Sequence, residues 1–131
     1  MVSLVLVSHS QQLAEGVREL AGQMTQGRVT IAVAGGTADG RLGTDATAIR
    51  AAIESARGPE GVLVLVDLGS AVLSTQLAME LLDADGGRVL LSNAPFVEGA
   101  VIAAVEASIE SDLDQVATAA LGAKDMEKVV A

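Results

Sequence analysis

The sequence predicts a single α/β domain built on a parallel β-sheet. Short, continuous apolar stretches typical of buried strands alternate with segments whose apolar residues recur every three or four positions, as in amphipathic helices. Half of the 131 residues are apolar, but only Phe96 is aromatic, so the interior must consist of aliphatic side chains, as is common in layered α/β proteins. Strands that alternate with helices are joined by right-handed crossovers, which makes the strands parallel.

The first strand is expected within V-S-L-V-L-V-S-H-S, residues 2–10, because five of the six residues from Val2 to Val7 are apolar. Helical periodicity starts at Gln11 and predicts a helix over residues 11–24, which Gly27 ends. The expected inner face of this helix is one apolar stripe made of Leu13, Val17, Leu20 and Met24.

A second buried strand is expected over residues 29–34, followed by the loop G-G-T-A-D-G-R-L-G, residues 35–43. The loop lacks the G-K-[ST] of a Walker loop and also lacks G-x-G-x-x-G, so we interpret it as a mobile flap over the site rather than a nucleotide cradle. Thr44 is expected to cap the next helix and Asp45 to complement its dipole. Gly58 and Pro59 end this helix, and its expected inner face is Ile49, Ile53 and Ala56.

The remaining chain continues the alternation, with strands expected over 62–66 and 89–91. The helix between them is marked by Leu73, Leu77 and Leu81. A helix over 96–109 is marked by Val97, Val101, Val105 and Ile109. The last helix is capped by Ser111 or Asp112 and marked by Leu113, Val116, Ala117, Ala120 and Leu121. We therefore expect one domain over 1–121 and a frayed tail over 122–131.

Composition argues against several functions. The chain has no cysteine, hence no disulfide or thiolate zinc site, and its one histidine stands without a carboxylate cluster that would bind a metal. A formal net charge of −9 argues against binding to nucleic acid. The acidic surface either keeps the protein soluble or attracts a basic partner. We also expect a cytoplasmic protein without membrane insertion, since no basic leader or membrane-length apolar run is found, and we expect no cofactor.

Four segments of the sequence are predicted to meet at one edge of the sheet. In a parallel sheet all carboxyl ends of the strands lie on the same edge, where ligands usually bind. Residues 8–10, 35–45, 67–70 and 93–95 each follow a strand or lead from it into a helix. They should therefore form one site.

His9 is the expected nucleophile of this site. A neutral imidazole nitrogen attacks a phosphoryl group well, and backbone N–H groups at the start of the following helix favour the resulting anion. Asp67 would accept a hydrogen bond from the protonated ring nitrogen and so orient the ring. Both residues also have an alternative explanation. Aspartate is well tolerated in turns, which would explain Asp67 at the end of its strand, and a single histidine such as His9 is often structural.

Hydroxyl and backbone groups near helix starts are the expected phosphate ligands, and each has an alternative interpretation. In the alternative interpretation the hydroxyls only cap the N-termini of helices. The two interpretations are compatible, because the backbone amides beside a cap also form an anion-binding site. Arg41 in the loop either reaches a phosphate or is solvated. The expected phosphate-binding residues are Ser8, Ser10, Thr44, Gly69 and Ser70.

Four spaced motifs together resemble a known family: V-S-L-V-L-V-S-H-S at the start, G-T-D at 43–45, V-D-L-G-S-A-V-L-S at 66–74 and A-P-F-V-E-G at 94–99. The sequence resembles the DhaM family, the phosphocarrier subunits of phosphoenolpyruvate-dependent dihydroxyacetone kinases, whose domain is related to mannose-type EIIA domains of the sugar phosphotransferase system. The resemblance spans residues 1–121. It implies a sheet of order 2-1-3-4 with helices on both faces, and a homodimer.

The same resemblance implies a phosphotransferase role. His9 would accept phosphate from HPr, which enzyme I charges, and pass it to the ADP-binding subunit DhaL. The resulting ATP would phosphorylate dihydroxyacetone held by DhaK. Some relatives carry HPr-like and enzyme I-like domains behind this domain, and here free HPr would be the donor.

Three alternatives remain at this point. The first is the EIIA domain of a mannose-type sugar transporter, although D-L-G-S-A and V-E-G favour the dihydroxyacetone branch. The second is a receiver-like domain phosphorylated on Asp67, which would need an acidic pair after the first strand and a lysine late in the sheet. Here the strand ends in S-H-S, and Lys124 and Lys128 lie in the tail. The third is a non-catalytic small-ligand or dimerisation module.

Overall fold

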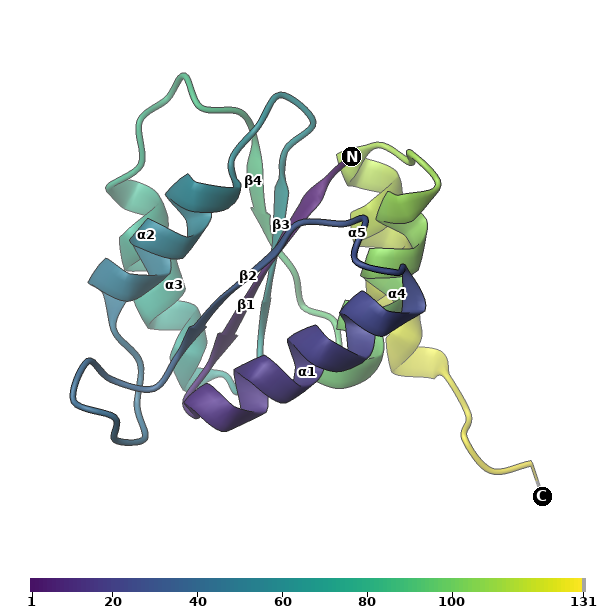
Figure 1. Ribbon diagram of the computed structural model, residues 1–131, viewed down its shortest axis with the longest axis horizontal. Coiled ribbons are helices and arrows are strands. Elements are labelled where there is room, and N and C mark those ends of the chain that lie inside the picture. Colours follow the sequence, from purple (N-terminus) through teal and green to yellow (C-terminus); the bar gives the residue numbers. More distant parts are fainter. Residues whose placement is uncertain (131) are drawn as a thin grey trace.

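The computed structural model describes residues 1–130 and contains a four-stranded sheet in the order β2-β1-β3-β4 with parallel pairing throughout, as expected (Figure 1). In the central register, Val5 lies between Ala32 and Val64. The strands are β1 (Ser3–Ser8), β2 (Ile31–Gly35), β3 (Val62–Val66) and β4 (Val89–Leu91).

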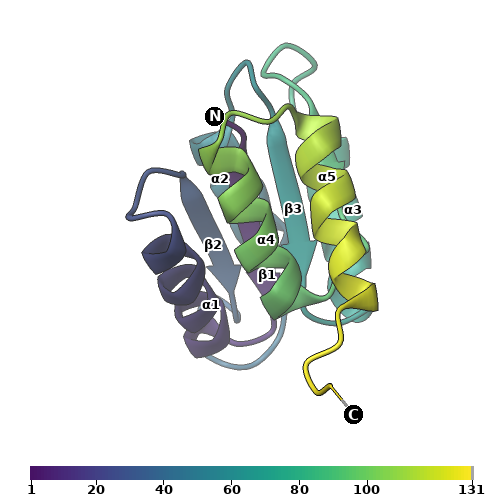
Figure 2. The same cartoon turned by 90° about the vertical axis from the view of Figure 1, so that its right-hand side faces the viewer.

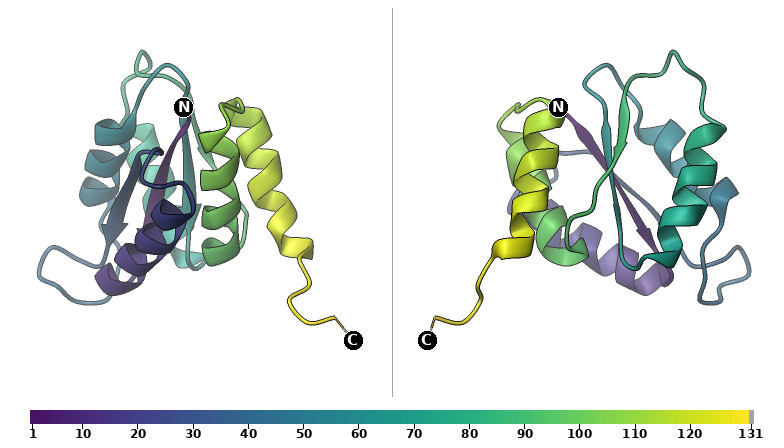
Figure 3. Two further views of the ribbon diagram at one scale, coloured as in Figure 1. Left: turned by 45° about the vertical axis from the view of Figure 1, so that its right-hand side comes forward. Right: turned by 180° about the vertical axis from the view of Figure 1, so that it is seen from behind.

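Helices cover both faces of the sheet (Figures 1 and 3). One face carries α2 (Ala46–Ala56) and α3 (Ser70–Glu80). The other carries α1 (Gln11–Met24), α4 (Phe96–Ser108) and α5 (Leu113–Gly122), which a short 3₁₀ turn extends over Ala123–Asp125 (Figure 2). Successive side chains of β1 alternate between the two cores, because strand residues point to opposite faces. None of these helices, within residues 1–130, is long and apolar enough to cross a bilayer.

Most element boundaries agree with the expectations from sequence. The strand over 62–66, the strand over 89–91 and the helix over 11–24 are confirmed. The second strand begins at Ile31 rather than Val29, and α4 ends at Ser108, one residue early. Thr44 was the wrong cap for α2, because the carboxylate of Asp45 accepts the N–H of Thr47. Asp112 caps α5 in a reciprocal capping box with Gln115.

The inner faces of three helices were predicted wrongly. In α1, α3 and α4 the large apolar residues point mainly outward, and small residues pack on the sheet. The stripes Leu13/Leu20/Met24, Leu73/Leu77/Leu81 and Val97/Val105/Ile109 are exposed. The buried residues include Ala14, Val17 and Ala21 of α1, Ala71, Thr75 and Ala78 of α3, and Ala100, Ala103, Ala104 and Ala107 of α4.

A close approach between helix and sheet explains this inversion in α4. A Cβ added to Gly99 would lie 2.8 Å from the Cβ of Ala94 and 3.1 Å from Leu65 Cδ2, so the backbone there leaves no room for a side chain. Interiors are close-packed, and only small residues fit between a helix and a sheet at this separation. The larger residues of the helix are consequently turned outward.

Candidate functional site

Three of the four predicted segments are joined by hydrogen bonds at the carboxyl edge of the sheet. The N–H of Gly36 donates to the carbonyl of Ser8 (3.1 Å), and the N–H of Gly43 donates to the carbonyl of His9 (2.9 Å). The N–H of Asp67 donates to the carbonyl of Val7 (3.1 Å). The fourth segment, residues 93–95, contributes Asn93 and Ala94 to a small hollow that Asp67, Leu68 and Gly69 also line. The sequence-based prediction that these segments converge is therefore met.

His9 is held by Asp67 through both its ring and its backbone. The ring Nδ1 lies 2.9 Å from Asp67 Oδ1, and the backbone N–H of His9 donates to Oδ2 over 2.9 Å. The hydroxyl of Ser8 donates to the same Oδ2 over 3.0 Å. These contacts fix the orientation of the imidazole relative to the end of β1.

The pKa of Asp67 lies below its ordinary value of 3.8. Burial of the carboxyl acts in the opposite direction, because a desolvated carboxylate is disfavoured. Hydrogen bonds from the His9 N–H, the His9 ring and the Ser8 hydroxyl outweigh that effect. Asp67 is therefore ionised at neutral pH and can only accept, so the ring proton of neutral His9 resides on Nδ1.

The other ring nitrogen, Nε2, faces the start of α3. It lies 2.7 Å from the hydroxyl of Ser70, the first residue of that helix. With the proton on Nδ1, Nε2 carries a lone pair and accepts this hydroxyl proton. The His9 side chain is 25% exposed and Ser70 is exposed, so this contact lies at the surface of the protein. No side chain caps the N-terminus of α3, whose N-cap residue is Gly69.

The remaining predicted hydroxyls already have partners within the protein. Ser8 is buried, and its oxygen also accepts the N–H of Ser10 (3.0 Å). The Ser10 hydroxyl caps α1 by accepting the N–H of Leu13 (3.2 Å). The hydroxyl of Thr44 lies 2.6 Å from that of Ser74. Of the predicted hydroxyls, the one that contacts Nε2 is that of Ser70.

Ser74 belongs to the site's surroundings and was missed in the sequence. It ties the start of α2 to α3 through Thr44. A signal was present, because Ser74 follows Ser70 by four positions and therefore shares its helix face. The serines of S-A-V-L-S are placed on one side of α3 by this spacing.

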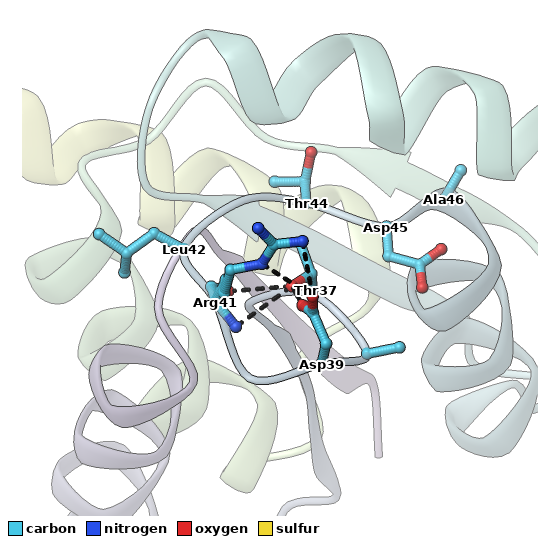
Figure 4. Close-up of a pocket in the computed structure, with 8 residues that line it drawn as sticks. Thr37, Asp39, Arg41, Leu42, Thr44, Asp45 and Ala46 are labelled. Atoms are coloured by element: carbon cyan, nitrogen blue, oxygen red, sulfur yellow. Dashed lines mark hydrogen bonds and ion pairs between the residues drawn. The ribbon is translucent and has the colours of Figure 1, made fainter.

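In the loop over residues 35–43, the side chain of Arg41 interacts with a residue of the same loop. The guanidinium of Arg41 pairs with Asp39, with Nε donating to Oδ2 over 2.7 Å, and the Thr37 hydroxyl bonds to the same carboxylate (Figure 4). The hydroxyl of Thr37 and the side chain of Arg41 hold the pKa of Asp39 below its usual value. The loop and the start of α2 enclose a hollow of about 650 Å³ whose lining includes Thr44 and Asp45. Arg41 is thus in an ion pair within the loop.

The part of the chain that the structure describes contains no cluster of side chains suited to binding a metal ion. Within residues 1–130, no group of three or more His, Asp or Glu side chains is arranged to hold a metal ion. The chemistry available at this edge is that of an oriented imidazole, a hydroxyl and two helix N-termini.

Fold and site together define a small α/β domain that presents one carboxylate-oriented histidine at the carboxyl edge of a 2-1-3-4 parallel sheet. The chain belongs to the EIIA-man family, described as "PTS system fructose IIA component", whose sequence profile matches residues 3–117.

Named relatives and a solved structure agree with this family. The chain is 44% identical over 132 residues to the phosphoryl donor subunit DhaM of the PEP-dependent dihydroxyacetone kinase of Escherichia coli, covering 98% of this chain and 28% of that protein. It is 44% identical over 110 residues to phosphoryl donor subunit DhaM of kinase 2 of Listeria innocua, covering 83% of this chain and 88% of that protein. The crystal structure of the unknown function protein EF1359 superposes with a TM-score of 0.78 at 36% identity, covering 92% and 93% of the two chains.

Proposed function

We propose that this chain is a histidine phosphocarrier that relays a phosphoryl group from HPr to ADP bound on a DhaL subunit, for the phosphorylation of dihydroxyacetone on DhaK. Two relatives that it resembles at 44% identity are named as phosphoryl donor subunits of such kinases. The observation that carries the proposal is the geometry of His9. Asp67 holds Nδ1, and Nε2 is directed to an accessible edge beside Ser70.

Phosphoryl acceptance takes place at Nε2. The lone pair of Nε2 attacks phosphorus in line with the donor's nitrogen–phosphorus bond, which breaks as the new bond forms. The donor imidazole leaves with the electron pair of the broken bond. The proton on Nδ1 of His9 stays in its hydrogen bond to Asp67, whose negative charge stabilises the imidazolium character of the phosphorylated ring.

The phosphoryl oxygens are bound by groups at the starts of two helices. The Ser70 hydroxyl, which donates to Nε2 in the free chain, turns to donate to a phosphoryl oxygen once Nε2 is occupied. The backbone of Gly69 and Ser70 at the uncapped start of α3, and the start of α1 after Ser10, supply positive dipole ends. Ser8 and Thr44 support this arrangement through Asp67 and Ser74 respectively.

Delivery reverses the same step. A terminal oxygen of ADP attacks phosphorus, the bond to Nε2 breaks, and the electron pair returns to the ring, which gives ATP on the acceptor subunit. His9 is restored to the free state with its proton on Nδ1. In this scheme the chain is a carrier that is itself phosphorylated, needs no cofactor of its own, and leaves the phosphorylation of dihydroxyacetone to the partner subunits.

The decisive experiment is phosphorylation with phosphoenolpyruvate, enzyme I and HPr. We expect one phosphate per chain that is labile in acid and stable in base, as phosphohistidine is. The chain has a single histidine, so any such label must be on His9. His9→Ala should abolish labelling. Label retained in that variant, or an acyl phosphate on Asp67, would contradict the proposal.

The transported-sugar alternative is kept because the matching family profile carries the description "PTS system fructose IIA component". The two functions differ in the acceptor only. Phosphorylated chain should lose its label rapidly to DhaL with ADP and should keep it when mixed with the sugar-specific components of a mannose-type transporter. The opposite result would assign the chain to sugar transport.

A further inference from the structure

The loop that carries Arg41 is attached at both ends to the end of β1. At one end the N–H of Gly36 donates to the carbonyl of Ser8 over 3.1 Å, and at the other the N–H of Gly43 donates to the carbonyl of His9 over 2.9 Å. Arg41 precedes Gly43 by two residues, so their Cα atoms lie at most about 7 Å apart. The backbone of Arg41 is therefore anchored close to His9, and it carries a long side chain.

The hollow beside Arg41 adjoins the face of α3 that contacts His9. Arg41 and Thr44 both line this hollow, whose volume is about 650 Å³ (Figure 4). The hydroxyl of Thr44 lies 2.6 Å from that of Ser74 on α3. One turn earlier on the same helix face, the hydroxyl of Ser70 lies 2.7 Å from Nε2 of His9. Because residues four apart on a helix have Cβ atoms about 5–6 Å apart, the hollow begins one helical turn from Nε2 and its hydroxyl partner.

Arg41 is the one lysine or arginine in the four segments that converge on His9. A phosphoryl group carries a charge of about −1.5 to −2 at neutral pH. On His9 it would add to a chain whose formal net charge is already −9. A guanidinium presents a planar set of N–H donors that matches two phosphoryl oxygens at once. Arg41 thus supplies the group that this edge of the sheet otherwise lacks.

A carboxylate of the same loop occupies this guanidinium in the free chain. Nε of Arg41 donates to Oδ2 of Asp39 over 2.7 Å, and the two side chains are 82% and 54% exposed. The hydroxyl of Thr37 and the side chain of Arg41 hold the pKa of Asp39 below its usual value, so the carboxylate is charged at neutral pH. Exposed ion pairs contribute little, because water and salt screen them. This pair can therefore be exchanged for a contact with a more highly charged anion.

We propose that Arg41 is a phosphoryl-binding residue, which leaves Asp39 and donates to oxygens of the phosphoryl group once that group is on His9. Asp39 holds the guanidinium in the free chain and releases it to the more highly charged phosphoryl group. Only hydrogen bonds and ion pairs change in this exchange. This role rests on the proposed phosphorylation of His9, and it adds a cationic ligand to the hydroxyl of Ser70 and the helix N-termini.

The test phosphorylates the chain without a partner protein. Phosphoramidate transfers its phosphoryl group to an imidazole nitrogen and releases ammonia, and ³¹P NMR then follows the second ionisation of the phosphoryl group against pH. A guanidinium contact favours the dianion and lowers the pKa of that group. Arg41→Ala should therefore move the midpoint of the ³¹P titration upward by about 0.5 pH unit. Arg41→Lys, which keeps the charge but loses the planar donor set, should restore only part of the shift.

The ion pair between Arg18 and Glu15 provides a matched control. It is also an exposed arginine–carboxylate pair, but it lies on α1 outside the four converging segments. Arg18→Ala changes the net charge by the same amount as Arg41→Ala and should leave the midpoint unchanged. Asp39→Asn removes the competing carboxylate and should lower the midpoint. Circular dichroism verifies that each variant remains folded.

The role of Arg41 is overturned if Arg41→Ala leaves the midpoint in place, or if Arg18→Ala moves it as far. A chain that phosphoramidate cannot phosphorylate on His9 would overturn both this role and the proposed function. A chain that shows the expected dependence on Arg41, but accepts no phosphate from HPr, would retain the phosphoryl-binding role of Arg41 and reject the relay.

Discussion

Two helices of equal length, α2 and α3, cover the same face of the sheet but bury different side chains. Each has 11 residues. Ile49 and Ile53 of α2 are almost completely buried between α2 and the strands, whereas α3 places Ala71 and Ala78 inward and its leucines outward. The difference shows that α2 contributes its large side chains to the core, while α3 leaves its leucines exposed.

The aspartates near the starts of these two helices differ in the same way. Asp45 caps α2 by accepting the N–H of Thr47 over 2.9 Å. Asp67, shortly before α3, accepts hydrogen bonds from His9, Ser8 and the N–H of Leu68, and the first turn of α3 has no side-chain cap. One carboxylate stabilises its own helix and the other organises the site. The same residue type therefore caps a helix in one segment and orients the His9 ring in the other.

The largest difference between the two helices should appear on truncation of a buried residue in α2. Ile53→Ala removes a side chain that is 0% exposed and should lower the free energy of unfolding by about 2–5 kcal/mol, through lost burial and the cavity left behind. Urea denaturation measures the loss. A change under about 1 kcal/mol would mean that α2 does not anchor this core.

Enlarging the inner face of α3 should have the next largest effect. Ala78 is 0% exposed, and Ala78→Leu should cost about 1–3 kcal/mol, because the helix must move away from the sheet to accommodate the larger side chain. The matched control is the neighbouring Leu77→Ala, which should change the free energy of unfolding by no more than about 0.5 kcal/mol, because Leu77 is half exposed. Equal losses for the two variants would show that Leu77 contributes to the core as much as Ala78 does.

Replacing the carboxylate before α3 should give a pH-dependent loss. Asp67→Asn removes charge-assisted hydrogen bonds but keeps an amide oxygen as acceptor, so the expected loss at neutral pH is about 1–2 kcal/mol. Because the folded-state pKa of Asp67 is below 3.8, its contribution is complete above that pH and disappears as the pH falls through the folded value. Urea unfolding of both proteins should therefore differ near neutral pH and converge in strong acid. If the difference in unfolding free energy between the two proteins instead grew as the pH fell, the folded-state pKa of Asp67 would not be lowered and this explanation would be refuted.

Removal of the cap of α2 should have the smallest effect of the series. Asp45→Ala leaves the N–H of Thr47 without its acceptor and should cost about 1 kcal/mol. Thermal unfolding followed by circular dichroism detects a change of this size. Labelling of His9 should be retained, since Asp45 makes its hydrogen bond to α2; a loss of labelling would place Asp45 in the site.

The sequence predicted the strands and the convergence of the site well, because both depend on local patterns. Continuous runs such as 62–66 have one plausible structure, and parallel strands necessarily end on one edge. The pairing of His9 with Asp67 followed from the same rule. The inner faces of α1, α3 and α4 could not be predicted in this way, because these helices carry apolar residues on more than one side.

The sequence by itself determined the alternation of strands and helices, the position of His9 at the end of the first strand, and the candidate acidic partner for its ring. The tertiary structure decided that alanines rather than leucines face the sheet on α3, that Ser8 supports Asp67 instead of facing open solvent, and that Nε2 of His9 faces the hydroxyl of Ser70. The physical reason is that periodicity specifies which residues share a face of a helix. The separation between helix and sheet, and the hydrogen bonds formed across segments, specify how each face is used.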